Sequence, residues 1–231
     1  MRKRTQGVWA PAGLLLAAAC LARGDLVETA AGRRVDGRVV ALSADGVQPA
    51  SGAAVAWADV RRVVFDRPPV FDSGARLRLR DGTSLAGVAR RLTRDAVVFR
   101  PAAAGGEMTV PMDRVAALQL AAGAALEAVR GADATNPVVV LRSGLVRSGG
   151  LVASSANNVL LKTPDGLEKF PLENLAGIVF GPVPPAAGPA VVLRNGDRLC
   201  GPPQWTGAGA RMDVAGTTVA VGLEALAEIR R

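Results

Sequence analysis

Two glycines five residues apart occur four times along this chain, and each pair follows the same apolar pattern. The pairs are Gly32 and Gly37, Gly82 and Gly87, Gly144 and Gly149, and Gly196 and Gly201. Apolar residues stand five and three positions before the first glycine, except for Thr29 in the first copy, and this period of two predicts a half-buried strand. Pairs such as Asp81-Gly82 favour the positive φ of a tight hairpin turn. The second glycine predicts a bulge or a sharp bend.

The four copies also end alike, on apolar residues at positions i, i+3 and i+5. These residues are Val60, Val63 and Phe65; Val115, Leu118 and Leu120; Leu175, Ile178 and Phe180; and, in the last copy, Leu226 and Ile229. A step of three followed by a step of two predicts one tight helical turn that runs into a strand. Asp113, Glu173 and Glu224 are equivalent acids at the start of these turns, so we expect them to cap the turns rather than to form a catalytic pair.

These patterns predict an all-β chain of four tandem units of about 45 residues, each a five-stranded small barrel. The expected boundaries are a signal peptide at 1–24, unit 1 at 25–66, a Pro-rich linker at 67–74, unit 2 at 75–120, an Ala-rich linker or short helix at 121–137, unit 3 at 138–180, a Pro-rich linker at 181–189 and unit 4 at 190–231. Because a lone unit of this size buries little apolar surface, we expect neighbouring units to pack as two pairs, the alternative being four separate beads. Similar Pro-rich linkers after units 1 and 3 suggest a duplicated pair.

The N-terminus has the charge order of a signal peptide. Three basic residues, Arg2 to Arg4, precede a short apolar run and small residues that allow cleavage after Ala22 or Gly24. The alternative is a buried N-terminal helix. Cys20 follows three alanines and is a candidate lipidation site, so the chain is predicted to be exported, periplasmic or extracellular, with a lipoprotein form as a variant. The rest of the chain has no apolar stretch long enough to span a bilayer.

The glycine motifs of units 2 and 4, Leu79 to Gly87 and Leu193 to Gly201, resemble the opening of Sm-like and SH3-like small barrels. They also resemble short β modules in exported envelope proteins of planctomycete-type bacteria. This resemblance covers nearly all of the chain after the signal peptide and implies a fold rather than a chemistry. Sm-like proteins often bind RNA.

Few residues offer chemistry, since histidine is absent and Cys200 is the single cysteine after the signal peptide. The candidate ligand contacts are Arg80, Arg142 and Arg194, at equivalent outward positions, together with Trp57 and Trp205. The alternatives are an ordinary solvated strand face for the arginines and core packing for the tryptophans. No residues match the spacing of a metal or cofactor site, and none are predicted to be catalytic.

The leading hypothesis is a non-enzymatic, exported interaction or assembly module of the bacterial cell envelope. Its partner would be another envelope protein or a polymer, bound without a small-molecule cofactor. The alternatives are a carbohydrate- or nucleic-acid-binding module and, third, a carboxylate-based hydrolase. The first 24 residues hold four basic and no acidic residues, so removing them leaves a net charge of +8 − 4 = +4, which is weak support for nucleic acid.

Overall fold

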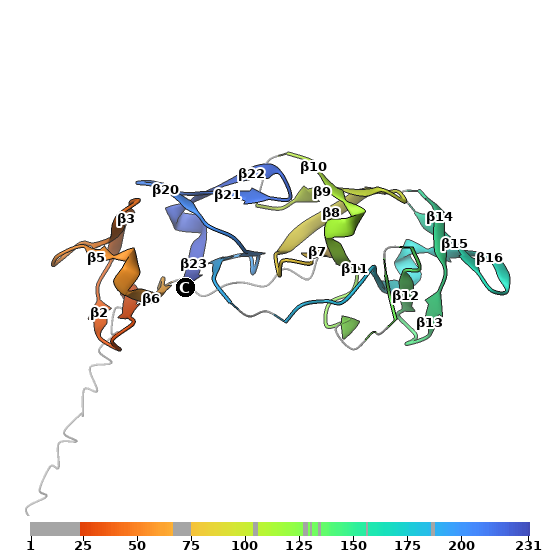
Figure 1. Ribbon diagram of the computed structural model, residues 1–231, viewed down its shortest axis with the longest axis horizontal. Coiled ribbons are helices and arrows are strands. Elements are labelled where there is room, and N and C mark those ends of the chain that lie inside the picture. Colours follow the sequence, from red (N-terminus) through yellow and green to blue (C-terminus); the bar gives the residue numbers. More distant parts are fainter. Residues whose placement is uncertain are drawn as a thin grey trace, which may run out of the picture.

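The computed structural model describes residues 24–66, 75–103, 106–126, 129, 131–133, 135–155, 157–185 and 188–231. The predicted signal peptide up to residue 23, with Cys20, and the linker 67–74 lie outside the described residues. The described residues form antiparallel strands and single 3-10 turns, with no α-helix among them (Figure 1). The predicted all-β class is confirmed. We keep the word unit for the four stretches of sequence defined above.

Units 1 and 2 contain the strands β1 to β11. Unit 1 consists of β1 (Leu26–Thr29), β2 (Arg34–Asp36), β3 (Val39–Leu42), β4 (Gly46–Pro49), β5 (Val55–Ala56), η1 (Trp57–Asp59) and β6 (Val60–Val64). Unit 2 consists of β7 (Ala75–Leu79), β8 (Ser84–Leu92), β9 (Ala96–Pro101), β10 (Met108–Pro111), η2 (Met112–Arg114) and β11 (Val115–Gln119).

Units 3 and 4 repeat the same order of elements. Unit 3 consists of β12 (Val138–Leu141), β13 (Val146–Ser148), β14 (Gly150–Ser154), β15 (Asn158–Thr163), β16 (Gly166–Pro171), η4 (Leu172–Asn174) and β17 (Leu175–Val179). Unit 4 consists of β18 (Ala190–Leu193), β19 (Arg198–Leu199), β20 (Gln204–Thr206), β21 (Gly209–Val214), β22 (Thr217–Gly222), η5 (Leu223–Ala225) and β23 (Leu226–Arg230).

The glycine pairs stand where the chain turns and where it bends. The first glycine of each pair has a positive φ, between 77° at Gly196 and 91° at Gly82, as a tight hairpin requires. The second glycine falls in the break that separates the hairpin from the next strand in units 1, 3 and 4. In unit 2 the strand β8 instead runs on through Gly87, where a side chain would collide with the carbonyl of Arg100 on β9. Three units therefore have six strands and only unit 2 has the expected five.

Within each unit the first strand lies between its hairpin partner and the closing strand. Thus β1 pairs with β2 and β6, β7 with β8 and β11, β12 with β13 and β17, and β18 with β19 and β23. The middle strands form separate three-stranded sheets in units 1, 3 and 4, whereas in unit 2 they continue from β8. None of the described sheets closes into a barrel. In units 1, 3 and 4 the break at the second glycine ends the ladder that closure would need, and in unit 2 the sheet stays open because β10 pairs with β9 alone among the described strands.

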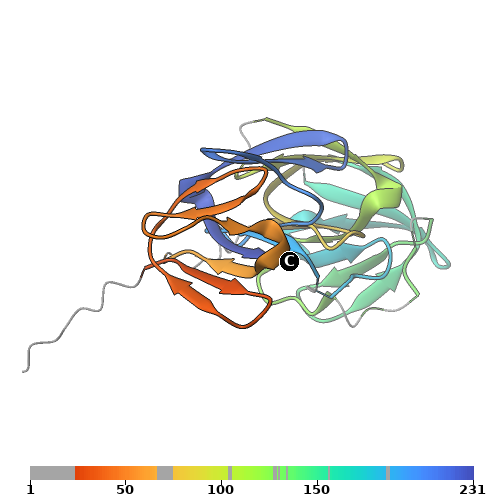
Figure 2. The same cartoon turned by 60° about the vertical axis from the view of Figure 1, so that its left-hand side comes forward.

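One sheet path runs through all four units, in the order β13-β12-β17-β11-β7-β8-β19-β18-β23-β6-β1-β2. The units therefore follow one another as 3, 2, 4 and 1, from right to left in Figure 1 and again visible in the turned view of Figure 2. The alternative prediction of four separate beads is therefore wrong, because one sheet connects all four units. Strand pairing between closing strands joins unit 1 to unit 4 and unit 2 to unit 3, and of these two pairs only units 2 and 3 are neighbours in sequence.

Each joint between units pairs equivalent strands in antiparallel orientation. Leu118 lies opposite Ile178, and Val63 opposite Ile229, and each of these four residues is the middle position of its closing pattern. At the central joint Ser84 of β8 lies opposite Arg198 of β19, each two residues after the first glycine. Pairing of equivalent residues gives every joint a local two-fold character. A single hydrophobic cluster extends through all four units beneath these joints.

The central joint is held by buried side-chain oxygens that exchange backbone hydrogen bonds. Thr83 Oγ1 accepts from Cys200 N at 3.1 Å, and Asp197 Oδ1 accepts from Ala86 N at 2.5 Å, so equivalent residues make reciprocal bonds. Asp197 is fully buried, and the guanidinium of Arg76 lies 3.6 Å from its carboxylate. A buried carboxylate is tolerated only when it is paired and hydrogen-bonded. This joint connects the two halves of the molecule.

We expect Asp197→Ala to lower the free energy of unfolding by about 3 kcal/mol, because the buried Ala86 N loses its acceptor and Arg76 loses its ion-pair partner, keeping only its bonds to the carbonyls of Asn195 and Gly196. Thr83→Val removes one acceptor from the same joint and should cost about 1 kcal/mol. Urea unfolding followed by circular dichroism measures both. An Asp197→Ala chain within about 0.5 kcal/mol of the wild type would show that this carboxylate does not hold the halves together.

Candidate functional site

The two tryptophans of the described chain meet across the boundary between units 1 and 4. Trp57 opens the 3-10 turn η1 and Trp205 lies in β20, and both are half-buried. Their rings stack with centroids 4.7 Å apart and planes inclined by 15°. Trp57 Nε1 donates to the carbonyl of Ser43 at 2.8 Å, which fixes the indole edge. One face of each ring is therefore used for packing between the two tryptophans, not for contact with a ligand.

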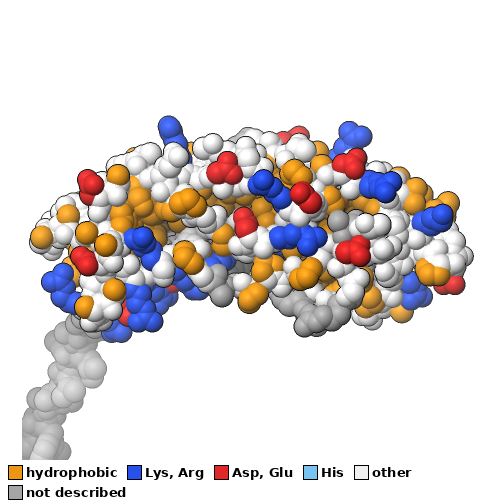
Figure 3. All heavy atoms as spheres, in the orientation of Figure 1, with side chains coloured by type: hydrophobic (Ala, Val, Ile, Leu, Met, Phe, Trp, Pro, Cys, Tyr) orange, Lys and Arg blue, Asp and Glu red, His pale blue; other side chains and the backbone are white. Residues whose placement is uncertain are grey.

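A groove of about 1270 Å³ opens beside this stack. Units 1 and 4 form its walls, and Asp81 of the second unit's hairpin reaches its edge. Its lining is mainly apolar and includes Pro189, Pro202 and Pro203. Apolar side chains gather where unit 1 meets unit 4, toward the left of Figure 3. A groove of this size and character can take a ligand of several residues.

The open edge of β20 lies at the groove. This strand pairs with β21 on one side only, and Gln204 and Trp205 belong both to it and to the groove lining. Pro202 and Pro203 precede it and cannot donate hydrogen bonds to a neighbouring strand. An extended backbone laid along β20 would therefore find free main-chain groups at Gln204 to Thr206 but none at the prolines.

Positive charge enters the groove from the end of β23. The guanidinium carbon of Arg231 lies 6.0 Å from the Trp57 ring centroid, within cation–π range, and this side chain donates to the carbonyl of Trp57. Arg230 also lines the groove. Asp81 is the single acid among the described lining residues, so the local charge favours an anionic group.

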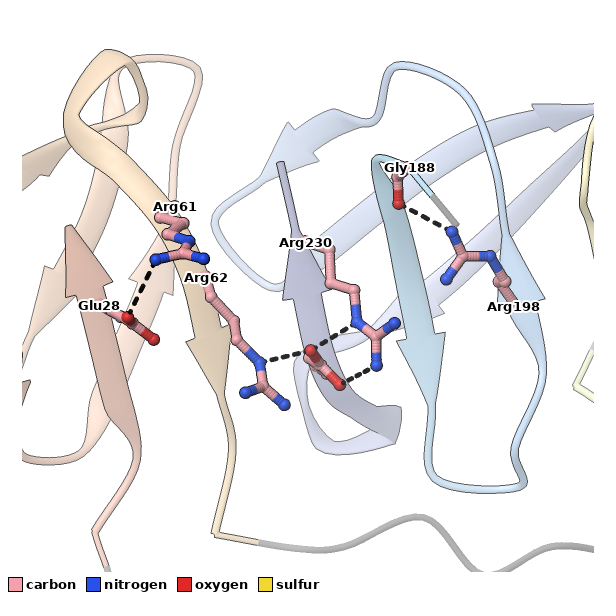
Figure 4. Close-up of polar contacts among 7 residues, drawn as sticks. Glu28, Arg61, Arg62, Gly188, Arg198 and Arg230 are labelled. Atoms are coloured by element: carbon pink, nitrogen blue, oxygen red, sulfur yellow. Dashed lines mark hydrogen bonds and ion pairs between the residues drawn. The ribbon is translucent and has the colours of Figure 1, made fainter. Parts of the chain in front are cut away.

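Glu228 ties unit 4 to unit 1 beneath this end of the groove. Its carboxylate accepts from Arg62 of β6 at 2.5 Å and from Arg230 at 2.7 Å (Figure 4). Burial acts to raise the pKa of Glu228, but the hydrogen bonds and charges of Arg230 and Arg62 outweigh burial and hold that pKa below its ordinary value of 4.5. The same pairing raises the pKa of Arg230.

The other half of the molecule has a groove of about 290 Å³ at the equivalent place, between units 2 and 3. Positions can be matched by counting from the first glycine or from the start of the closing strand. The matched residues, smaller groove first, are Gly87 and Gly201, Val88 and Pro202, Arg91 and Trp205, Leu120 and Arg231, and Leu172 and Trp57. The backbone framework is thus shared, and the tryptophans, the prolines and Arg231 at the place of Leu120 distinguish the larger groove.

The arginines at the predicted outward positions do not share one environment. Arg80 donates through Nη2 to the carbonyl of Phe180 at 2.9 Å, which joins unit 2 to unit 3. Arg142 is exposed, whereas Arg194 is half-buried and its Nε has no hydrogen-bond partner. Arg80 is therefore exposed like Arg142, but its guanidinium is engaged in a structural contact.

The prediction that acids cap the 3-10 turns is wrong about the hydrogen bond, although the acids lie in the expected turns. Asp113, Glu173 and Glu224 do lie in the first turn of η2, η4 and η5, but no side-chain capping hydrogen bond forms at these turns. Pro111, Pro171 and Gly222 occupy the cap positions instead. Proline lacks a side-chain acceptor, so the turns are set by backbone geometry. The acids are exposed.

A third groove, of about 440 Å³, brings acids of units 1 and 4 together. Asp25 and Asp66 of unit 1 and Glu224 of unit 4 line it, along with Arg38. Both oxygens of Asp25 accept backbone hydrogen bonds, from Val39 N at 2.7 Å and Asp66 N at 2.8 Å. The two other carboxylates are exposed, so no difference in environment assigns them separate acid and base roles.

Sequence reasoning missed the residues that complete the larger groove. Arg231, Arg230 and the prolines around Gly201 were not singled out, although an apolar residue would continue the closing pattern where Arg231 stands. A charged residue at this apolar position was the sequence feature that could have identified Arg231 as a groove residue. Cys200 also lines the groove, half-buried and without a histidine anywhere in the chain to activate it.

No protein-family model matches the chain, and neither a curated protein nor a solved structure is significantly similar to it. Within the described ranges, no group of three or more Cys, Asp or Glu residues is placed to hold a metal ion. No helix found in those ranges is long and apolar enough to cross a membrane.

Stacked indoles couple their electronic transitions, so we expect an exciton couplet in the circular dichroism spectrum of the chain that disappears in Trp205→Leu and in Trp57→Leu alike. A double-mutant cycle between these substitutions should give a coupling free energy of about 1 kcal/mol. Leu172→Ala in the equivalent groove is the control and should leave the couplet intact. A couplet that survives either tryptophan substitution would contradict the stack.

The Glu228 pairing gives a defined dependence of stability on pH. Because the folded state lowers this pKa, the contribution is present above 4.5 and is lost as pH falls through the lowered folded value. Wild type should therefore exceed Glu228→Gln in unfolding free energy at neutral pH, and the gap should close in acid. Thermal melts of both chains across this range measure the gap. A gap that stays constant with pH would show that the carboxylate charge is not what joins β6 to β23.

Proposed function

We propose that this chain is a non-catalytic, exported interaction module whose larger groove binds an extended peptide segment of a partner protein in the bacterial envelope. The groove beside the Trp57–Trp205 stack is the observation that carries this proposal. We also infer that the four units are copies of one Sm-like or SH3-like β unit in opened form. Their equivalent strand orders and joints support that relation.

An extended peptide fits this groove for three reasons. The apolar, proline-containing wall suits a segment with fixed extended conformation. The free edge of β20 offers main-chain hydrogen bonds beside it. Arg231, whose guanidinium lies beside the Trp57 ring, favours a carboxylate in the bound segment. Aromatic and arginine side chains are also the types that contribute most to binding energy in protein interfaces.

A sugar or nucleic-acid ligand is less well served by the same residues. Such ligands stack on an open aromatic face, but one face of Trp57 is covered by Trp205 and the Arg231 guanidinium also lies over the ring. Arg80, one of the three candidate arginines, is engaged with Phe180. Polymer binding therefore stands as an alternative outcome of the experiment below.

Selection of a randomised displayed peptide library on the purified chain should enrich extended apolar sequences that carry proline and an acid. Trp205→Ala should weaken the selected peptides by about 30-fold, the effect of losing a binding hot spot of about 2 kcal/mol. The control is Arg91→Ala, at the matched position in the groove of about 290 Å³ between units 2 and 3, and this variant should bind as the wild type does. Fluorescence anisotropy of labelled peptides measures the affinities.

Two results would overturn the proposal. One is equal loss of peptide affinity in both variants, and the other is selection of no peptide while a nucleic acid or an acidic polysaccharide binds. Affinity for such a polymer would fall steeply with salt, since it depends on charge neutralisation, whereas peptide affinity should change little. Urea unfolding of Trp205→Ala separates lost binding from lost folding.

A further inference from the structure

The long sheet ends on two strands that occupy equivalent positions in their units. These are β2 in unit 1 and β13 in unit 3, each the second strand of a glycine hairpin and each paired on one side only. They lie at opposite ends of the molecule in Figure 1. Their counterparts β8 and β19 pair with each other at the central joint. The chain therefore uses this strand internally as a joint in two units and leaves it open in the other two.

The two open edges differ in chemistry. On β2 the exposed residues Arg34 and Asp36 present charge, and charged side chains protect an edge from pairing with another chain. The edge at β13 instead presents Leu145 and Val146, which are 46% and 49% exposed. Arg147, the one charged residue of β13, is half-buried and turned to Glu168, 3.8 Å away.

Exposed apolar side chains concentrate in the same unit. Among the described residues, six large hydrophobic side chains are exposed, and four of them belong to unit 3: Leu145, Val146, Val152 and Leu167. Two of the four, Leu145 and Val146, stand at the open edge itself, and exposed apolar side chains at an open strand edge are a feature of interaction surfaces.

We propose that β13 is a homodimerisation edge, at which it pairs antiparallel with β13 of a second copy of this chain. The central joint supplies the geometry, since there the residues two positions after the first glycine, Ser84 and Arg198, lie opposite each other. The same position in unit 3 is Val146. A two-fold axis through this point places Val146 opposite Val146 of the second copy, an apolar pair in a closed, isologous interface.

The charges on β2 select this dimer over longer assemblies. The same joint between two β2 strands would place Arg34 opposite Arg34, and like charges directly opposite are destabilising. A joint between β2 and β13 would place Arg34 opposite Val146 and bury the guanidinium without a partner. Only the pairing of β13 with itself escapes both costs, so the assembly stops at two copies.

Sedimentation over low to high micromolar concentration tests the stoichiometry. We expect the wild-type chain to be a dimer, Val146→Lys to shift it to a monomer, and the control Val40→Lys to remain a dimer. Val40 is 46% exposed, on β3 of unit 1, so the control makes the same chemical change at an equally exposed site. A monomeric wild type, or a dimer that persists in Val146→Lys, would overturn the proposal.

Cross-linking tests the two-fold register in folded protein. In a background with Cys20→Ser and Cys200→Ser, Val146→Cys should form a disulfide-linked dimer under mild oxidation, because residues opposite across an antiparallel pair bring their Cβ atoms within reach. Val40→Cys in that background should stay monomeric on a non-reducing gel. Equal cross-linking of both, or of neither, would place the interface elsewhere.

Discussion

Antiparallel pairing between equivalent strands is the constraint on which this structure depends. A unit of about 45 residues buries too little apolar surface to be stable alone. Here β6 pairs with β23, β11 with β17 and β8 with β19, so each unit continues the sheet of another and the hydrophobic cluster extends through all four. The middle joint also holds a buried carboxylate, Asp197, which accepts from Ala86 N and pairs with Arg76.

The same pairing explains why two equivalent grooves differ. Each half of the molecule places one unit's hairpin and closing strand against the 3-10 turn of another. Aliphatic and small side chains together with Arg90 and Arg91 line about 290 Å³ between units 2 and 3, whereas the other half has about 1270 Å³ beside a tryptophan stack. The same backbone arrangement thus forms two grooves with different side chains, and only the larger groove combines aromatic rings, prolines and arginines.

Local patterns predicted the strands and turns well because they report interactions within a few residues. Asp81-Gly82 and Asn195-Gly196 do form hairpins with positive φ, and the closing pattern at Leu175 does follow a 3-10 turn. In units 1 and 4 the expected closure into a barrel fails at the second glycine, since the chain leaves the strand around Gly37 and Gly201, whose φ angles are 148° and 115°. In unit 2 the strand continues through Gly87 and the sheet stays open at β10 instead. Whether a glycine bends a strand or ends it depends on the neighbouring ladder, which local sequence does not encode.

The candidate site was predictable only in part. Trp57 and Trp205 were singled out by residue type, yet their contact joins positions 148 residues apart in separate units. The sequence by itself determined the all-β class and the places of the hairpin turns and closing 3-10 turns, because period, glycine and turn chemistry act locally. Only the tertiary structure decided that unit 1 meets unit 4, that the groove forms between them and that β13 is left open. Those outcomes depend on which strand edges pair over long range, and all four units offer nearly the same edge.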